Sequence, residues 1–337
     1  MPQVHNGAKV LVTGASGFIG SWVVRYLLER DYSVRAAVRS AEKGEYMRRL
    51  YESYGDQFEY VVVADSGEPG TFDNVLEDID AVEHHAAPIT DDPDDFVAAA
   101  ISGTTSLLES ILRKGRSVKR VIVTSSGAAL VEPKEPGYVY TEADWGDYSV
   151  KEVQSKGANA TTLQKYRASK ALAERAAWDF VEKHKDQIQW DVVTVLPTIV
   201  YGPIIHQVES PEDINYSNQL LYSSITRERS PDEVGGNWVD VRDVAEIHVE
   251  LLAKRTAGGE RYIVSAGAHS WQELYDLLNA SVPPIGGIPR GQPGNYTRGR
   301  PPYSFSSEKV IKLLGIRFRA LGESARDAIT SIRERGM

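Results

Sequence analysis

Several common features are missing from this chain of 337 residues. It contains no cysteine, which excludes disulfide bonds and thiolate chemistry. It also lacks any run of about 18 apolar residues, the length needed to cross a membrane. The first nine residues, Met1 to Lys9, hold no apolar signal region. We therefore expect a cytoplasmic protein with no membrane partner.

Positive charge is scarce as well. The chain has 38 Lys and Arg against 47 Asp and Glu, a net charge of −9, and no basic cluster. Because phosphate backbones are bound by basic clusters, we expect no nucleic-acid partner. With 42% hydrophobic and 25% charged residues, the composition is that of an ordinary globular protein. Its length fits one large domain or two unequal lobes, as a monomer or a homodimer.

A glycine-rich turn follows the first aliphatic run, in the order Val10-Leu11-Val12-Thr13-Gly14-Ala15-Ser16-Gly17-Phe18-Ile19-Gly20. Apolar residues then recur at helical spacing, which predicts a strand, a turn and a helix. This order is typical of a dinucleotide site. Gly14 permits the tight turn, Gly17 lets the backbone approach a pyrophosphate, and Gly20 lets the helix pack on the strand. The alternative is a glycine turn that binds no ligand. The motifs described below favour the dinucleotide site over this alternative.

The residue after the second expected strand, 33–38, indicates which cofactor binds. Arg39 stands nineteen residues after Gly20, and Lys43 follows shortly. NAD sites place Asp or Glu about 20 residues after the glycines, whereas Arg accommodates the 2′-phosphate of NADP. The sequence therefore predicts NADP(H). Two solvated surface cations are the alternative, but that interpretation leaves the missing carboxylate unexplained.

The next two expected strands end at Asp65 and at Ala86, where small residues let a strand approach the adenine ribose and the pyrophosphate. Asp65 either accepts a hydrogen bond from the adenine amino group or forms a turn, and the sequence leaves both open. The neighbours His84 and His85 suggest a metal site. Successive side chains of a strand point to opposite faces, however, so the two histidines cannot share an ion. We interpret them as packing or polar-contact residues and expect no metal.

A fifth strand, 118–124, leads into the pair Ser125-Ser126. Forty residues after Ser126 come Tyr166 and Lys170, which lie on one face of an alanine-rich helix because they are four residues apart. None of the other 16 tyrosines has Lys at this spacing. A phenol ionises near pH 10, and a neighbouring cation favours its phenolate. One buried Tyr and one surface Lys would be the alternative; the serine pair and the glycine turn favour a catalytic set.

These motifs, 13–20, 124–126 and 166–170, resemble those of extended short-chain dehydrogenases/reductases. Arg39 with Lys43, together with 197–203 and 239–244, is similar to the branch of fungal NADPH-dependent aldehyde and ketone reductases of the methylglyoxal reductase type. Plant dihydroflavonol reductases are related to this branch. The resemblance covers nearly the whole chain and implies that the catalytic residues are Ser126, Tyr166 and Lys170. With the motifs above, it implies as NADP(H)-binding residues Gly14, Ser16, Gly17, Phe18, Ile19, Gly20, Arg39, Lys43, Asp65, Ala86, Tyr166, Lys170, Pro197, Ile199 and Val200.

The chain departs from the neighbouring families at informative positions. Dihydroflavonol reductases carry Asn five residues after the catalytic serine, where this chain has Val131. Cinnamoyl-CoA reductases have a longer motif around the tyrosine that 163–170 lacks. Sugar-nucleotide epimerases usually have Asn before the Gly-Thr pair of the fourth helix. In this chain the segment before that pair is Ala100-Ile101-Ser102, which contains no Asn. An NDP-sugar epimerase or dehydratase, and a non-catalytic NADP(H)-binding regulator, remain the alternatives.

Alternating strands and helices predict an α/β fold, a Rossmann-type doubly wound parallel sheet with a smaller mixed C-terminal substrate lobe. The expected NADP-binding domain is 1–200, with 239–265 returning to it. The expected substrate lobe consists of 201–238 and 266–337. The stretch 204–233 has little periodicity and is expected to form part of this lobe. We also predict an irregular surface loop at 282–303 and helices near 271–278, 308–314 and 323–333.

The predicted function is NADPH-dependent reduction of an aldehyde or ketone. Tyr166 would act as general acid, Ser126 would bind the carbonyl oxygen, and Lys170 would position the ribose. Six mostly apolar residues are expected to line the substrate pocket: Phe96, Ala128, Val131, Tyr201, Leu221 and Tyr222. Such a lining suits a small hydrophobic carbonyl compound better than a sugar nucleotide or CoA ester, whose phosphates need cations or helix N-termini.

Overall fold

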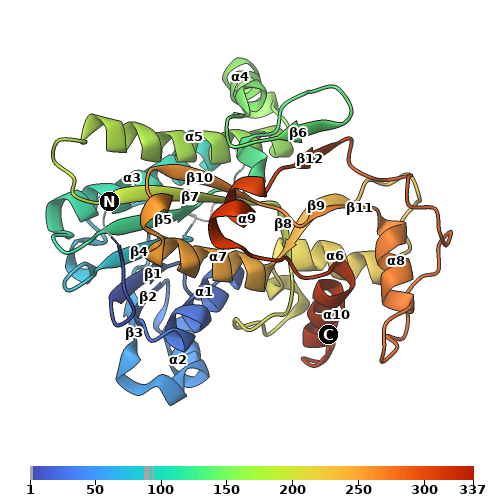
Figure 1. Ribbon diagram of the computed structural model, residues 1–337, viewed down its shortest axis with the longest axis horizontal. Helices are drawn as coiled ribbons and strands as arrows, with labels where there is room; N and C mark the ends of the chain where they lie inside the picture. Colours follow the sequence, from blue (N-terminus) through green and yellow to red (C-terminus); the bar gives the residue numbers. More distant parts are fainter. Residues whose placement is uncertain (1–2, 87–91, 93–94) are drawn as a thin grey trace. The chain divides into compact units, whose positions relative to one another are not determined.

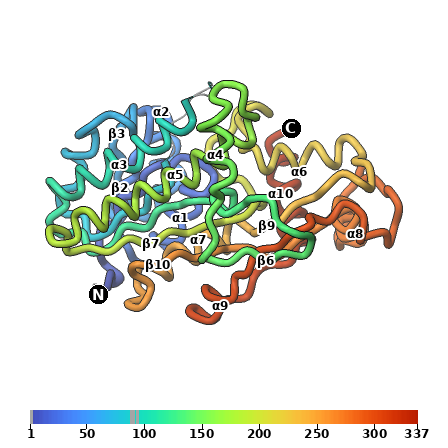
Figure 2. Tube along the Cα trace, turned by 90° about the horizontal axis from the view of Figure 1, so that it is seen from above, coloured from blue at the N-terminus to red at the C-terminus, as the bar shows by residue number. Residues whose placement is uncertain are grey.

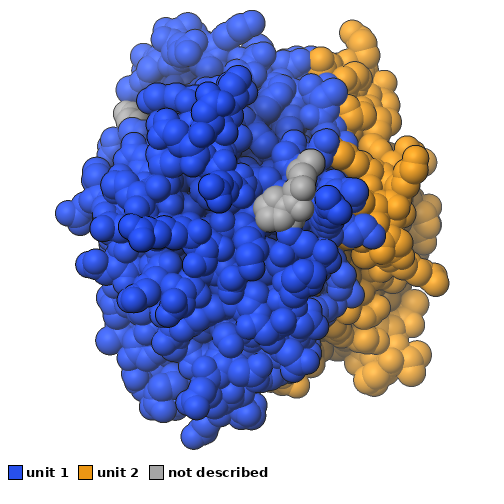
Figure 3. All heavy atoms as spheres, turned by 60° about the vertical axis from the view of Figure 1, so that its left-hand side comes forward, with its two compact units in different colours: residues 1–133, 142–196, 245–262 blue, residues 134–141, 197–244, 263–337 orange. Residues whose placement is uncertain are grey.

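The computed structural model describes residues 3–86, 92 and 95–337 (Figure 1). These residues form two compact units, which Figure 3 shows in different colours. Unit 1 consists of Met1–Pro133, Glu142–Leu196 and Ala245–Tyr262. Unit 2 consists of Lys134–Thr141, Pro197–Val244 and Ile263–Met337.

A seven-stranded sheet in the order β10-β7-β5-β4-β1-β2-β3 forms the centre of unit 1. Its strands are β1 (Lys9–Thr13), β2 (Ser33–Val38), β3 (Phe58–Val62), β4 (Ala81–His84), β5 (Arg120–Thr124), β7 (Asp191–Pro197) and β10 (Glu260–Val264). The pairs from β3 across to β7 are all parallel. Strand order reverses between β1 and β4, and ligands of open α/β sheets bind at the carboxyl ends beside such a reversal. The predicted doubly wound sheet is confirmed.

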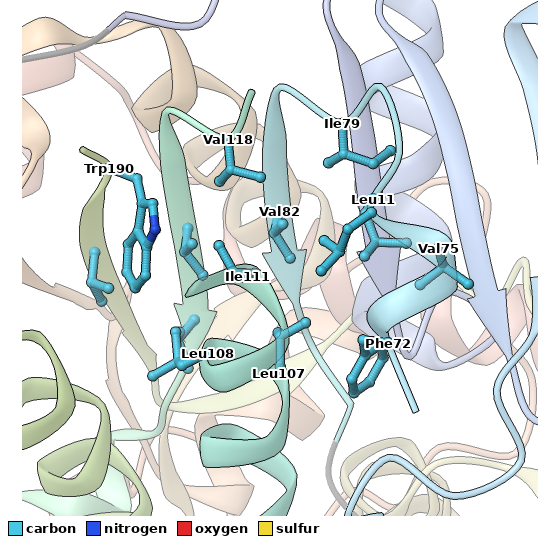
Figure 4. Packing of buried hydrophobic residues seen from close by; sticks show 14 of the residues in the cluster. Leu11, Phe72, Val75, Ile79, Val82, Leu107, Leu108, Ile111, Val118 and Trp190 are labelled. Carbon is cyan, nitrogen blue, oxygen red and sulfur yellow. The ribbon is translucent and has the colours of Figure 1, made fainter. Parts of the chain in front are cut away.

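Helices cover both faces of this sheet (Figure 1). One face carries α3 (Phe96–Lys114) and α5 (Thr162–Lys183), which lie side by side in Figure 2. The other face carries α1 (Phe18–Glu29), α2 (Ala41–Leu50) and α7 (Val241–Ala253). Leu107, Leu108 and Ile111 of α3 pack on Leu11 and Val82 of the sheet (Figure 4). This close-packed apolar core fixes the position of the helix on the sheet.

The remaining helix of unit 1 is α4 (Asp147–Lys156), which packs on α5 through Val150 and Ala168. Both helices present small or β-branched residues to each other, so their backbones approach closely. No helix in the described part of the chain has the length and apolar composition needed to cross a membrane.

Unit 2 contains two small sheets and four helices. The strands are β6 (Tyr138–Tyr140), β8 (Ile199–Tyr201), β9 (Gly236–Asp240), β11 (Gly267–His269) and β12 (Tyr303–Phe305). β9 pairs parallel with β8 and antiparallel with β11, and β6 pairs parallel with β12. The helices are α6 (Tyr216–Thr226), α8 (Trp271–Asn279), α9 (Glu308–Leu314) and α10 (Leu321–Arg333). Their core includes Tyr201, Leu221, Trp238, Trp271 and Ile329. The mixed character predicted for the second lobe is confirmed.

Some elements differ from the sequence expectation. The helix of Tyr166 and Lys170, α5, begins one turn before Tyr166, at Thr162, because Thr161 and Gln164 form a capping box there. The stretch 204–233 contains α6, whose many hydroxyl residues weaken its hydrophobic period. The irregular loop predicted at 282–303 is confirmed for 282–302, which form no helix or strand, whereas Tyr303 begins β12.

Candidate active site

The turn between β1 and α1 takes its shape from its glycines. Gly14 has a φ of +64°, and a Cβ atom there would lie 2.7 Å from the backbone N of Ala86. A Cβ atom on Gly20 would lie 2.3 Å from the carbonyl oxygen of Gly14. At both positions only glycine lets the backbones approach. Gly17 is exposed at the start of α1, and a Cβ atom there would make a tight contact of 3.3 Å with the carbonyl oxygen of Gly14.

The N-terminus of α1 fits a pyrophosphate. Gly17 is the N-cap and offers no side-chain hydrogen bond, and the first turn carries no acidic residue. Amide N–H groups and the positive end of the helix dipole therefore face an anion without competition. Ser16 and Ile19 are half-buried beside this turn, and Phe18 is buried. The residues present thus fit the dinucleotide that the sequence predicts.

Two cations lie beyond the end of β2. Arg39 directly follows the strand, and Ser40 caps α2 by accepting a hydrogen bond from the backbone N–H of Lys43 (3.4 Å). The exposed side chain of Arg39 has no hydrogen bond or ion pair with any described residue. Lys43 is half-buried. Cations without a carboxylate at this position suit a 2′-phosphate.

The ends of β3 and β4 are held by short polar contacts. Oδ1 of the exposed Asp65 accepts a hydrogen bond from the N–H of Gly67 (2.8 Å). Asp65 therefore forms a turn, one of the two possibilities that the sequence allowed. Thr13 Oγ1 hydrogen bonds to His84 Nδ1 (2.7 Å) and accepts from the N–H of Ala86 (3.3 Å). Burial and the nearby charge of Lys170 lower the pKa of His84 to about 4. His84 is therefore neutral near pH 7.

The predicted proton donor and its cation lie one turn apart on α5. The Nζ atom of Lys170 is 5.8 Å from the centroid of the Tyr166 ring. Tyr166 is 40% exposed, so its side chain is not enclosed in the core. Lys170 lines a cavity together with His84, Ala86 and Thr124, at the carboxyl ends of β4 and β5. The structure thus brings Lys170 and Ala86 to the ligand-binding edge of the sheet.

Ser126 follows β5 and caps the short helix η4 (Gly127–Ala129). Its Oγ atom accepts a hydrogen bond from the N–H of Ala128 (3.1 Å). A hydroxyl group that accepts one hydrogen bond can still donate its proton, here to a carbonyl oxygen. Ala168 of α5 packs on Ala129 of this turn. The helix of Tyr166 and Lys170 is therefore in direct contact with the turn of Ser126.

His84 and His85 belong to separate hydrogen-bond networks, as strand alternation predicts. His85 Nδ1 bonds to Thr124 Oγ1 (2.6 Å), which also bonds to His248 Nε2 (3.2 Å). His248 Nδ1 bonds to Glu83 Oε2 (2.8 Å). Sequence reasoning missed this buried network because His248 comes from the distant helix α7.

Three members of this network also offer metal-ligand atoms. Glu83, His85 and His248 each bring one such atom within 4.8 Å of the others. Burial raises the pKa of Glu83 and lowers that of His85 well below its usual value, so both groups favour their neutral forms. Both ring nitrogens of His248 already have hydrogen-bond partners. We interpret the cluster as a hydrogen-bonded network, and the expected absence of a metal stays a prediction.

The predicted substrate and nicotinamide residues are divided between the units. In unit 1, Phe96 and Ala128 are half-buried and Val131 is buried. In unit 2, Tyr201 and Leu221 lie wholly within the hydrophobic core. The others in unit 2 are Tyr222, Pro197, Ile199 and Val200. The assignment of all these residues to ligand binding stays a prediction.

Comparison with known proteins gives a consistent result. The family model "NAD dependent epimerase/dehydratase family" matches residues 10–267. The chain is 35% identical over 340 residues to the ketoreductase azaE of Aspergillus niger, covering 97% of this chain and 98% of that protein. It is 35% identical over 342 residues to the NADPH-dependent methylglyoxal reductase GRE2 of Saccharomyces cerevisiae, covering 96% and 98%. The crystal structure of yeast methylglyoxal/isovaleraldehyde reductase Gre2 complexed with NADPH matches with a TM-score of 0.85 and 32% identity, covering 97% and 98%.

Proposed function

The chain belongs to the NAD dependent epimerase/dehydratase family, and from this premise we propose that it reduces a small hydrophobic aldehyde or ketone through Ser126, Tyr166 and Lys170. It is an extended short-chain dehydrogenase/reductase and an NADPH-dependent oxidoreductase that acts on carbonyl groups. The observation that carries the proposal is the pairing of Tyr166 with Lys170 on a helix that packs against the turn of Ser126.

Each of these three residues has a separate role. The hydroxyl group of Ser126, already oriented by Ala128, donates a hydrogen bond to the carbonyl oxygen of the substrate. Tyr166 donates its phenolic proton to the same oxygen as general acid. Lys170 holds the ribose and stabilises the negative charge left on Tyr166. NADPH, when bound, supplies the hydride that reaches the carbonyl carbon.

The cofactor would be held by features of unit 1. The glycine turn and the N-terminus of α1 would bind the pyrophosphate, with Ala86 beside it. Arg39 and Lys43 would bind the 2′-phosphate, and Asp65 lies at the end of the adjacent strand. The relatives named as reductases favour this function over the NDP-sugar epimerase or dehydratase and over the non-catalytic regulator.

The substrate class is tested with a panel followed by NADPH absorbance. The panel contains an aromatic ketone, short and branched aldehydes, a flavonoid, a CoA thioester and a UDP-sugar. We expect turnover of the ketone or of an aldehyde, because Ala128 and Val131 beside Ser126 are apolar and offer nothing to a phosphate. Turnover of the UDP-sugar alone would contradict the proposal. Turnover of the flavonoid would show that Val131 does not decide against that substrate.

The proton donor is tested with Tyr166→Phe. This change removes the phenolic proton but leaves the phosphate-binding turn intact, so we expect kcat to fall by about 10² to 10⁴ while the Kd for NADPH stays the same. Tyr148→Phe is the control, because Tyr148 is another exposed tyrosine on the neighbouring helix α4. Wild-type turnover by the Tyr166 variant would show that another group is the acid.

We also propose that the protein is cytoplasmic and monomeric or homodimeric, with the carbonyl substrate as its partner. Cell fractionation tests the location, and light scattering of the purified chain tests the oligomeric state. Recovery in a membrane fraction, or a larger assembly, would contradict this part of the proposal.

A further inference from the structure

A buried carboxylate lies one helical turn beyond Lys170 on α5. Glu174 is 1% exposed, and its Oε2 atom accepts a hydrogen bond from Ser125 Oγ (2.7 Å). Its Oε1 atom accepts from Thr194 Oγ1 (2.8 Å) and from Arg261 Nε (2.7 Å). The donors come from the end of β5, from β7 and from β10. One side chain of the helix thus binds three strands of the sheet.

The partner cation of Glu174 is equally well held. Arg261 Nη2 also donates to Glu174 Oε2 (3.2 Å), and Nη1 donates to the carbonyl oxygens of Glu142 (2.6 Å) and Asp144 (2.9 Å). The Cζ atom of Arg261 lies 3.7 Å from the ring centroid of Trp145. A buried ion pair is costly unless its remaining hydrogen bonds are made, and here they are made. Such a pair fixes the geometry around it.

What this ion pair fixes is the local geometry of the proposed catalytic residues. Ser125 directly precedes Ser126, and Glu174 shares α5 with Tyr166 and Lys170. Ser125, Lys170 and Glu174 line the same cavity. The hydrogen bond from Ser125 to Glu174 therefore joins the turn that carries the oxygen-binding serine to the helix that carries the proton donor.

The strand end is anchored on its other face as well. Thr124 bonds to His85 and His248, and successive residues of a strand point to opposite faces. Thr124 is thus held from the side of α7 and Ser125 from the side of α5. Of these two anchors, the one at Ser125 forms a hydrogen bond with the helix of Tyr166.

We propose that Glu174 is a positioning residue for carbonyl reduction, which sets Ser126 relative to Tyr166 and Lys170 through Ser125. This inference rests on the proposed function of those three residues. Loss of the anchor shifts Ser126 without changing the glycine turn or Arg39, which follow the separate strands β1 and β2. It should therefore lower kcat and leave cofactor binding unchanged. A displacement of about 1 Å in an active site costs up to about 10²-fold in rate.

The test compares two matched hydroxyl deletions. Ser125→Ala and Thr194→Val each remove one donor to Glu174 and keep the carboxylate and Arg261. We expect Ser125→Ala to lower kcat by about 10-fold or more at unchanged Kd for NADPH, and Thr194→Val to keep kcat within about twofold. Both variants should lower Tm by a similar amount. Equal losses of kcat that follow Tm would show that Glu174 serves stability alone and would overturn the proposal.

A double-mutant cycle identifies Glu174 as the source of the effect. If Ser125 acts through Glu174, adding Glu174→Gln to Ser125→Ala lowers kcat by less than the product of the two separate effects, whereas Glu174→Gln and Thr194→Val multiply. Independent effects of Ser125→Ala and Glu174→Gln would contradict the proposal.

Hydrogen exchange supplies a readout without turnover. In the wild type, the turn 124–130 is held by the Ser125 anchor, so Ser125→Ala and Glu174→Gln should speed amide exchange there, and Thr194→Val should not. Unchanged exchange in both anchor variants would overturn the proposal even if the enzyme has no turnover on the panel. Absent turnover in the wild type, with the exchange pattern as expected, would instead count against the proposed function.

Discussion

Arg39 differs from most arginines of this protein because its guanidinium group has no ion pair with any residue that the structure describes. Other guanidinium groups, such as those of Arg35 and Arg113, pair with carboxylates or carbonyl oxygens. The guanidinium group of Arg39 lies at the end of β2, shortly before the half-buried Lys43 in the sequence, and can pair with a phosphate. We therefore propose that the preference for NADPH over NADH depends on this side chain.

Replacing Arg39 with Asp should narrow or invert the cofactor preference. The carboxylate would repel the 2′-phosphate of NADPH and could accept a hydrogen bond from the ribose hydroxyl of NADH. The measurement is kcat/KM for both cofactors in both proteins. Arg116→Asp is the control, because Arg116 is exposed in the turn before β5 and the change in charge is the same. Equal use of both cofactors by the wild type would contradict the assignment.

At the same scale, some functional residues were predictable and others were not. Tyr166 and Lys170 are four residues apart, so helix geometry alone places them together, and the structure shows this pairing. Glu174 and Arg261 are 87 residues apart and come from a helix and a strand. No local spacing reveals such a contact, and a lone Glu in an alanine-rich helix is usually solvated. Buried ion pairs between distant elements can therefore be identified only from the structure.

At the scale of elements, the three glycines of the first turn are not equivalent. Gly14→Ala forces a non-glycine residue to a φ of +64° and a Cβ against Ala86, so it should lower the free energy of unfolding by about 1–2 kcal/mol or more. At Gly17 a Cβ atom would lie 3.3 Å from the carbonyl oxygen of Gly14, a tight contact that a small shift relieves, so Gly17→Ala should cost only about 1 kcal/mol. Its methyl group points into the proposed phosphate site, so it should weaken NADPH binding. Urea unfolding and NADPH titration of both variants separate the effects, and tight NADPH binding by Gly17→Ala would contradict the site.

A buried arginine at the start of β5 also links several elements. The fully buried Arg120 donates to both carboxylate oxygens of Asp191 in β7 (2.6 and 2.9 Å). Its Nη1 atom donates to the carbonyl oxygens of Leu251 (2.6 Å) and Lys254 (2.7 Å) at the end of α7. A cation is favourable at the negative end of a helix dipole. One side chain thus ties two strands to the helix on the opposite face.

Arg120→Met should lower the free energy of unfolding by about 3–5 kcal/mol, because it leaves a carboxylate and several carbonyl oxygens without their donor. Arg113→Met is the control, since it breaks half-exposed ion pairs with Asp73 and Glu109 and a hydrogen bond to Ser110, and it should cost about 1 kcal/mol. Urea unfolding followed by circular dichroism gives both values. Equal stability of the two variants would show that the buried contacts contribute little.

The elements themselves were largely predictable in unit 1 and less so in unit 2. β2, β4, β5 and β7 carry β-branched runs that end in turn residues, so their positions follow from local pattern. β6 and β12 have three residues each and pair over a long distance in the sequence. Strands this short have too few residues to show a period, and only their mutual pairing defines them.

At the scale of the whole molecule, the chain passes repeatedly between its two units. The predicted domains assigned 134–141 to the cofactor domain, whereas the structure includes this stretch in unit 2 because β6 pairs with β12 there. The crossing near Pro197 follows from the end of β7 and could be predicted. The hydrophobic pattern thus identifies where the large sheet ends. It does not identify a short segment such as 134–141, which leaves unit 1 to add a strand to a sheet of unit 2.

Buried histidines in both units should make the whole protein sensitive to acid. Burial, with the charge of Lys170 at His84, lowers the pKa of His84 and of His269 to about 4, and burial lowers the pKa of His85 well below its usual value. A histidine of this kind takes up its proton only on unfolding, so its contribution to stability is present above about pH 6.5 and is lost as the pH falls toward 4. Burial raises the pKa of Asp243 to about 6, which acts in the opposite direction.

Three buried histidines lose stability in acid, whereas two buried acids with raised pKa values, Glu83 and Asp243, gain it. Because the histidines are more numerous, we expect a net loss of stability in acid. We therefore expect the free energy of unfolding to fall between pH 7 and pH 5, by up to about 1.4 kcal/mol per pH unit for each histidine. The variant His269→Gln should reduce this loss by up to about 2 kcal/mol, because Gln keeps a partner for the Tyr201 hydroxyl but takes up no proton. The exposed His5, changed to Gln, is the control. Urea midpoints at both pH values measure the effect, and a stability that rises as the solution is acidified would show that the buried acids outweigh the histidines.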